Sequence, residues 1–482
     1  RVPNCGSSTP LVTKDGGVFE VRPAVSGPGS RLVGRAPDGT RYFFQHLVKD
    51  QYDTVTHPTQ IRVITNTGPG YSVSSHVPET LRRDIYVLYA TRVEDRFGNS
   101  VNYEWNGARL VRIHANDGRE IVVHSSKVAP TLSEAEDPRY QVDRITARGD
   151  VGDAGREWQY LLFSDRREVV NPDGTRWVYR GAVPRAIEYE RERDVILSTM
   201  PFQAGKQSML ADIATCTKAY PFKSGQVATI EVTHPSGASM AYRLQPVRHG
   251  RAATPFSCNQ QSDDQLTWNS RIPRYEDGWT LVERNLSGPA IAPVRTTYTY
   301  DGLGVSFAPG WEQYVAPNEI AQGPQRKVVT ATRSDGTALR FTYGRDYGIN
   351  EGLMLAEETL SGGTVASRVD HTYVLPSENA SQAFALAFGA ITMGYSDQFS
   401  AYNVPVKSSV RTQDGATFTT SQQSFDAWAR PTSSTASSSL GSSRTASTAY
   451  HDNLSLWVVG QTSRQVLAGV ETSRIEFNAL AQ

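Results

Sequence analysis

The chain has 482 residues, and its 49 Lys and Arg residues equal its 49 Asp and Glu residues, so the formal net charge is zero. This balance argues against nucleic acid as a partner, and the absence of any run of about 18 apolar residues argues against a membrane-spanning helix. Abundant Tyr (22) and Gly (39) with little Met (5) favour strands and turns over helices.

Residues 1–90 are predicted to form an N-terminal β-rich region that leads into repeats. Pro37-Asp38-Gly39-Thr40 is a turn sequence, and the aromatic strand Arg41–Phe44 follows it. The first residues lack an initiator Met and a signal-peptide pattern, and the last residues resemble the middle of a strand. We therefore expect a processed or trimmed piece of a longer polypeptide.

Residues 95–126 show the chain's characteristic pattern most clearly. Asp95–Asn99 is a turn, and Val101, Tyr103 and Trp105 then alternate with polar residues, which predicts one face of a strand. Asn106-Gly107 is a strong two-residue hairpin signal, and the return strand begins near Leu110. A second turn at Asn116–Arg119 leads into a third strand, so we predict a β-meander.

The same order of turn and aromatic strand recurs at irregular intervals along residues 91–482, which we interpret as degenerate hairpin repeats. Turn sequences start at Pro172, His234, Ser334 and Gln413, and aromatic-Asp steps occur in Tyr298–Gly302 and Phe425–Pro431. Insertions are expected near residues 130–145, 190–225 and 375–395, with a short helix after Ser377. The Ser/Thr-rich segment Thr432–Tyr450 is compatible with a flexible linker, but its aromatic flanks favour a hairpin.

No catalytic, cofactor or metal motif stands out. Cys216 and Cys258 flank a strand-like segment and could form a disulfide in an exported protein, or remain two buried thiols; Cys5 is then unpaired in this stretch. Asp263, Asp264 and Asp277 could offer oxygen ligands to a cation, but no spacing resembles a calcium loop, and we favour solvated loop carboxylates. We therefore predict no enzyme activity, no metal and no cofactor.

The segments DRFGN, YEWNGARL, NDGRE, TYTYDG and FDAWARP together resemble the RHS-repeat, or YD-repeat, family. Ala108 and Ala429 stand where the family has Gly, and Trp105-Asn106 stands where it has Tyr-Asp. The resemblance implies a long antiparallel strip of β-hairpins that spirals into a hollow shell. The motif residues are Asp95, Gly98, Tyr103, Trp105, Asn106, Gly107, Arg109, Leu110, Asp117, Gly118, Tyr300, Asp301, Gly302, Phe425, Asp426 and Arg430.

Three functional hypotheses follow. The first is a structural segment of a secreted or cell-surface bacterial shell that encapsulates or presents a C-terminal toxin or effector. Its partners would be further repeats and that effector domain. The alternative is an extracellular adhesive or filament-forming protein that self-associates into a fibre or binds cell-surface glycans, with Trp268, Trp279 and Trp311 as candidate stacking residues. A polysaccharide-acting enzyme, which needs two facing carboxylates, is the third.

Overall fold

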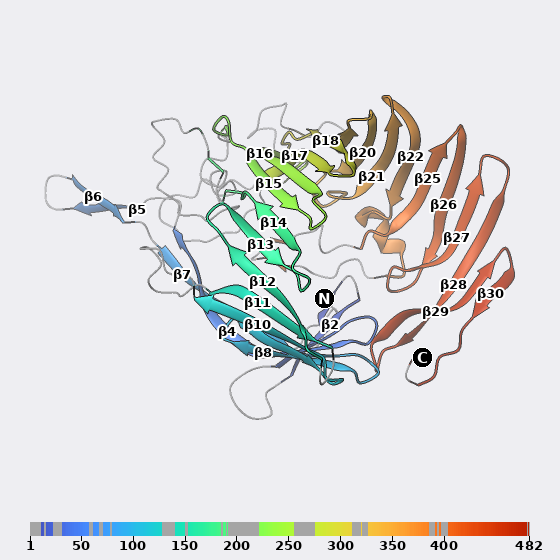
Figure 1. Ribbon diagram of the computed structural model, residues 1–482. Helices are drawn as coiled ribbons and strands as arrows, with labels where there is room; N and C mark the ends of the chain where they lie inside the picture. The colour runs from blue at the N-terminus through green and yellow to red at the C-terminus, as the bar shows by residue number, and fades with distance from the viewer. Residues whose placement is uncertain are drawn as a thin grey trace.

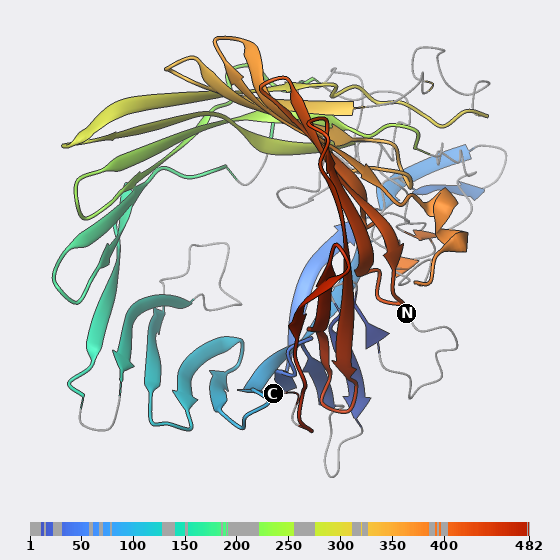
Figure 2. The same cartoon turned by 90° about the vertical axis from the view of Figure 1, so that its right-hand side faces the viewer.

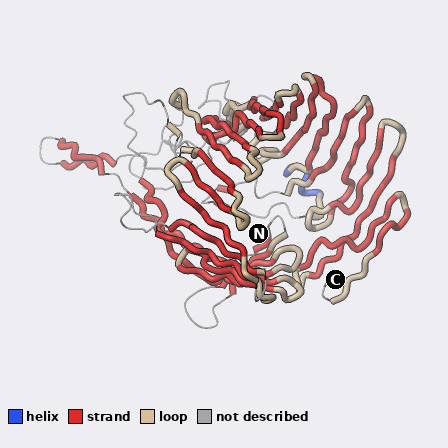
Figure 3. Tube along the Cα trace, viewed as in Figure 1, coloured by secondary structure: helices blue, strands red, loops and turns tan. Residues whose placement is uncertain are grey.

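The computed structural model describes residues 11–13, 16–22, 31–56, 61–66, 71–77, 80–127, 140–149, 153–184, 187–188, 190, 221–254, 275–310, 320, 326–384, 391–392, 395–396, 403–479 and 481. Within these residues nearly all regular structure is β-strand (Figure 3). The described helical structure is one short 3-10 helix, η2 (Pro376–Ser381), close to the helical turn expected after Ser377. The predicted all-β fold is confirmed.

The first half of the chain supplies fourteen strands. They are β1 (Leu11–Val12), β2 (Val18–Arg22), β3 (Arg31–Arg35), β4 (Arg41–Thr56), β5 (Ile61–Asn66), β6 (Tyr71–Val77), β7 (Thr80–Glu94), β8 (Ser100–Asn106), β9 (Arg109–Ala115), β10 (Glu120–Lys127), β11 (Tyr140–Arg148), β12 (Arg156–Leu162), β13 (Arg166–Val170) and β14 (Arg176–Arg180). The predicted meander is present as β8, β9 and β10.

The second half continues the series. It contains β15 (Ala228–Thr233), β16 (Ser239–Gly250), β17 (Tyr275–Gly288), β18 (Ile291–Asp301), β19 (Arg326–Arg333), β20 (Thr337–Gly344), β21 (Met354–Ser361), β22 (Thr364–Tyr373), β23 (Ile391–Thr392), β24 (Tyr395–Ser396), β25 (Val406–Gln413), β26 (Ala416–Phe425), β27 (Pro431–Ser438), β28 (Ser443–Asn453), β29 (Val458–Leu467) and β30 (Val470–Arg474). The Ser/Thr-rich segment is the hairpin β27–β28, which confirms the prediction of a hairpin.

Each strand pairs with its neighbours along the chain, and together 26 strands form one antiparallel sheet. The hairpins β5–β6 and β23–β24 form separate two-stranded sheets, so β4 pairs directly with β7 and β22 directly with β25. β1 and β30 are the two ends of this series. The molecule is therefore a strip of successive hairpins, as the sequence pattern predicts.

The two long edges of the strip differ in their connections. Because strand direction alternates, successive connections fall on opposite edges. One edge, which we call the short-turn rim, carries the turns after β3, β7, β9, β13, β15 and β27, and its longest connection is residues 149–155. The opposite edge, the long-loop rim, carries the connections 57–79, 128–139, 181–227, 251–274, 302–325 and 374–405. The strands that flank all three expected insertions therefore end at the long-loop rim, although β11 already begins at Tyr140 within the expected 130–145 insertion; most residues of the first two insertions lie outside the described residues.

One turn geometry recurs because the turn sequences are alike. The recurring turn has five residues. The first residue donates its backbone N–H to the carbonyl of the fifth, and the fourth donates its N–H to the carbonyl of the first. The fourth position has positive φ, which favours Gly. The turns are Thr13–Gly17, Ala36–Thr40, Asp95–Asn99, Ala115–Arg119, Asn171–Thr175, His234–Ala238, Asp426–Arg430 and Ser438–Ser442. Asp side chains reinforce several of them; for example, Asp95 accepts the Phe97 N–H at 2.8 Å.

The hairpin between β8 and β9 differs from the prediction by one residue. Asn106 still belongs to β8 and pairs with Arg109, so the two-residue loop is Gly107–Ala108 and not Asn106–Gly107. Gly107 has φ of +59°, and no positive φ occurs at Ala108. Gly at the first loop position is the requirement of a type II′ turn, which explains the shift.

The strip follows a wide curve that brings its last strands back beside its first ones (Figures 1 and 2). Among the described residues fully buried apolar side chains are few, because no second layer of described structure covers the sheet. They gather where connections or strip ends pack together. Val18, Val33 and Val458 lie where the ends meet, and Ala252, Tyr275 and Phe307 lie at the long-loop rim beside β16–β18.

Candidate functional site at the seam of the strip

The two ends of the strip meet at a set of contacts that we call the seam. Here the turn between β28 and β29 contacts two other turns, the one between β1 and β2 and the one between β3 and β4. Val459 donates its backbone N–H to the Pro37 carbonyl at 2.8 Å, and Asp38 and Val458 form an isolated antiparallel bridge. Arg35 Nη1 also donates to the Ser455 carbonyl at 3.0 Å. The long-loop rim of the last strands is thus bonded to the short-turn rim of the first.

Trp457 is the side chain that spans the seam most directly. Its indole Nε1 donates to the Gly16 carbonyl at 2.7 Å, and its ring packs edge-to-face on Trp428 with 5.8 Å between ring centroids. Trp457 has φ of +58°, a left-handed conformation that costs a bulky residue about 1–3 kcal/mol. This conformation persists because the contacts around it compensate for that strain.

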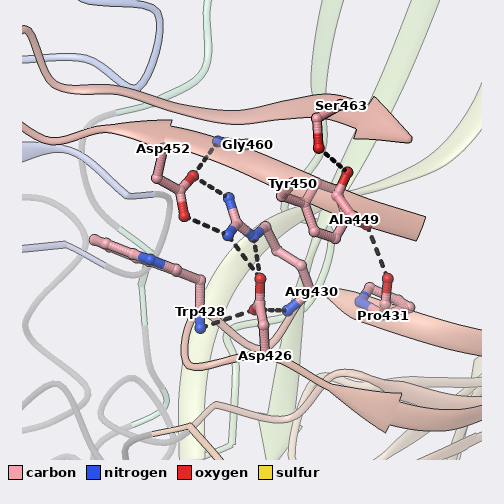
Figure 4. A network of polar contacts seen from close by, with 9 residues as sticks. All are labelled: Asp426, Trp428, Arg430, Pro431, Ala449, Tyr450, Asp452, Gly460 and Ser463. Carbon is pink, nitrogen blue, oxygen red and sulfur yellow. Dashed lines mark hydrogen bonds and ion pairs between the residues drawn. The ribbon is translucent and has the colours of Figure 1, made fainter. Parts of the chain in front are cut away.

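The turn before β27 is held by a charged network behind Trp428 (Figure 4). Asp426 accepts the backbone N–H groups of Trp428 and Arg430 at 2.9 and 3.0 Å, and it also accepts Arg430 Nε at 2.7 Å. Arg430 then binds Asp452 with both terminal nitrogens at 2.8 Å. Asp452 accepts the Gly460 N–H at 2.8 Å, just after the seam residues.

Mutual attraction keeps Arg430 and Asp452 ionised. The hydrogen bond from Arg430 lowers the pKa of Asp452 against the opposing effect of burial. Burial by itself would lower the pKa of Arg430, but its hydrogen bonds to Asp452 and Asp426 raise it. Paired in this way, the three charges link the turn to β28, and β28 ends at the seam.

A tyrosine contact recurs beside this network and elsewhere in the strip. Tyr450 Oη donates to the Pro431 carbonyl at 2.9 Å, 19 residues earlier in the chain. Tyr300 and Tyr373 donate in the same way to Leu281 and Met354, each at 2.7 Å and each across 19 residues. In all three cases a Tyr near the end of one strand binds the backbone of the preceding strand. Of these, only Tyr300 was among the motif residues expected from the sequence.

The remaining motif residues have structural contacts distributed along the strip. Trp105 Nε1 donates to the Ala90 carbonyl at 2.8 Å, and the Arg109 guanidinium lies 3.6 Å from the Tyr140 ring centroid. A Cβ at Gly302 would lie 2.0 Å from the Arg326 carbonyl oxygen, so this position requires Gly. The other motif residues belong to turns or to their strands: Gly98 and Gly118 have positive φ, Asp117 binds Arg119, Tyr103, Leu110 and Asp301 pair within the sheet, and Phe425 contacts Phe384.

Only part of the candidate ligand chemistry falls in the described residues. Asp277 is buried and paired with both Nε and Nη2 of Arg248 at 2.8 and 2.7 Å, so its expected role as a solvated carboxylate is wrong. Cys216, Cys258, Asp263, Asp264, Trp268 and Trp311 lie outside the described residues. Within the described ranges, no group of three or more His, Cys, Asp or Glu side chains could hold a metal ion. No helix there is long and apolar enough to span a membrane.

No protein-family model matches the chain, and no curated protein matches it. The resemblance to RHS/YD-repeat proteins therefore stays a prediction. The seam itself was not predicted, because it joins residues more than 400 positions apart. The only local signal is a Trp at the hairpin end in Ser455-Leu456-Trp457, because the positive-φ positions of the other described turns hold Gly, Ala or Asp.

Proposed function

We propose that the chain is a structural segment of a secreted or cell-surface shell of the RHS/YD-repeat type, whose wall encloses or presents an effector. The observation that carries the proposal is the seam. A curved strip whose long-loop rim bonds to its own short-turn rim can continue as a spiral wall, in which most backbone groups are paired and few edges stay open.

The composition of the strip supports a wall more than a packed enzyme domain. Most strand residues are partly exposed on both faces, and the fully buried core is small. Stability then comes from backbone pairing, repeated turns and charge pairs such as Glu358 with Arg340 and Arg368. These features are what a wall that encloses an effector requires.

Electron microscopy of the native particle that contains this chain tests the proposal. A closed particle with a wall one sheet thick supports enclosure, and density inside it would locate the effector. A rod or a fibre of repeating units would contradict the shell and support the filament-forming alternative.

A second candidate function, adhesion to glycans, is favoured by one observation. An open groove of about 650 Å³ lies over β9–β12 and is lined mainly by polar and charged residues: Arg109, Val111, Val123, His124, Ser125, Asp143, Arg144, Glu157, Gln159, Tyr160 and Leu161. Its two Arg and two carboxylate residues balance in charge, which suits a neutral ligand with many hydroxyl groups. Saturation-transfer NMR against a glycan panel tests this. A glycan that binds in the groove should give a signal that Gln159→Ala reduces, and the absence of such a signal for every glycan would reject adhesion at the groove.

A further inference from the structure

A polar cluster at the start of β19 is unlike the other charged contacts of the strip. Four adjacent strands supply it: His249 from β16, Thr280 from β17, Tyr300 from β18 and Lys327 from β19. Lys327 Nζ lies 2.9 Å from His249 Nδ1, and His249 Nε2 lies 2.8 Å from Thr280 Oγ1. The Tyr300 ring centroid lies 6.0 Å from both the imidazole centroid and Lys327 Nζ.

The hydrogen bonds determine the protonation state of His249. The Lys327 amine donates, so His249 Nδ1 accepts, and the ring proton must then lie on Nε2 and point to Thr280 Oγ1. Thr280 in turn donates to the Gly278 carbonyl at 3.2 Å. A second proton on His249 would face the amine directly. Burial and then Lys327 accordingly lower the pKa of His249 to about 4.

Lys327 lacks a carboxylate partner of the kind that Lys223 and Lys407 have. Lys223 pairs with Glu188 at 2.8 Å and Lys407 with Glu378 at 2.5 Å, and both are exposed. No described carboxylate oxygen lies within 4.0 Å of Lys327 Nζ, whose hydrogen-bond partner is a neutral imidazole. Burial, followed by the Arg345 charge, lowers the pKa of Lys327 despite the opposing effect of Glu276. Its unprotonated form is therefore more accessible than that of an ordinary lysine.

We propose that Lys327 is a nucleophilic amine that condenses with small aldehydes or ketones, and that His249 is the residue that positions it. A half-buried amine near the charge of Arg345, held in place by His249 and with no described carboxylate within 4.0 Å, is in the kind of surroundings that favour Schiff-base formation. The proposal is independent of the shell function, because the cluster lies at β16–β19 and not at the seam.

The reaction balances without any redox partner. Lys327 loses its proton to solvent, and the nitrogen lone pair forms a bond to the carbonyl carbon while the carbonyl π electrons move to oxygen. That oxygen gains a proton, and the nitrogen loses its second one, which gives a neutral carbinolamine. Loss of the hydroxyl group as water then forms the C=N bond of an imine.

Reductive labelling of the intact chain tests the proposal. The probe is formaldehyde at limiting concentration and neutral pH, with cyanoborohydride to reduce the imine, followed by peptide mapping by mass spectrometry. Lys327 is expected to react roughly tenfold faster than Lys223 and Lys407. This advantage should vanish when the chain is unfolded in guanidinium chloride. Labelling of Lys327 at the rate of those two lysines, or slower, would overturn the proposal.

The His249→Gln variant separates positioning from burial alone. Circular dichroism confirms its fold, and the pH profile of labelling at Lys327 is then compared with that of the unmodified chain. The pH midpoint of labelling should stay, because burial and Arg345 lower the pKa of Lys327, but the rate should fall across the whole profile as the amine loses the acceptor that orients it, while Lys223 stays unchanged. An unchanged profile in a folded variant would show that His249 does not position the amine. If this variant does not fold, Thr280→Val, which removes the partner of His249 Nε2, replaces it under the same criteria.

Discussion

Replacing Trp457 with Phe should loosen the seam without removing its aromatic packing. The variant keeps a ring beside Trp428 but loses the N–H that binds the Gly16 carbonyl at 2.7 Å. Gly16 is buried, so its carbonyl oxygen would be left without this donor. Leaving a buried acceptor unsatisfied costs about 1–3 kcal/mol, which corresponds to a factor of roughly 5–150 in the equilibrium for opening the seam.

Amide hydrogen exchange measures this opening locally. A global unfolding curve would not resolve it, because so long a chain need not unfold in one step. The Val459 N–H, bound to the Pro37 carbonyl, should exchange faster by the factor given above. Trp105→Phe is the matched control, because it removes the same kind of bond, from Trp105 Nε1 to the Ala90 carbonyl, far from the seam in sequence. Unchanged exchange at Val459 in the Trp457 variant, or equal acceleration in the control, would refute the reasoning.

Three further predictions concern stability. Ala429 has φ of +61° at the turn position that is Gly elsewhere, so Ala429→Gly should raise stability by up to about 1 kcal/mol, seen as a higher midpoint in thermal unfolding. Tyr450→Phe removes the bond to the Pro431 carbonyl and should cost about 1 kcal/mol in urea unfolding; an unchanged midpoint would show that the contact is not stabilising. The pKa of His249 is about 4 in the folded chain and ordinarily 6.5. As pH falls from 6.5 to 4, the unfolded chain therefore takes up this proton before the folded chain does, and the free energy of unfolding should fall. After solvent screening the loss is about 1–2 kcal/mol, and it should be smaller in His249→Gln, as followed by the unfolding midpoint against pH.

The turns could be predicted from the sequence because their chemistry is local. Asp at the start and Gly at the fourth position are sufficient to define turns such as Asp95–Asn99, whatever lies across the strip. The same locality explains the error at Asn106-Gly107: the pattern identifies a hairpin there, but the pairing of Asn106 with Arg109 decides which two residues form the loop.

The seam and the Lys327 cluster could not be predicted in the same way. The partner of Trp457 is Gly16, and the sequence pattern does not encode how far the strip curves before its ends meet. His249 and Lys327 come together only because β16 to β19 pair in one register, and long connections separate these residues in the chain. The recurring Tyr contacts to residues 19 positions earlier were detectable in principle, but the irregular strand lengths hide their spacing.

A cysteine cross-link across the seam tests the return of the strip to its own start most directly. Asp38 and Val458 are bridge partners, and such pairs have Cα atoms about 4.5–5.5 Å apart, within the range of disulfides. The double variant Asp38→Cys with Val458→Cys should therefore form a disulfide under mild oxidation, as detected in the mapped peptides. The pair Asp173→Cys with Val458→Cys uses the equivalent position of a turn in the middle of the strip and should not. A missing cross-link in the first pair, or an equal yield in the second, would contradict a strip whose last turns return to its first ones.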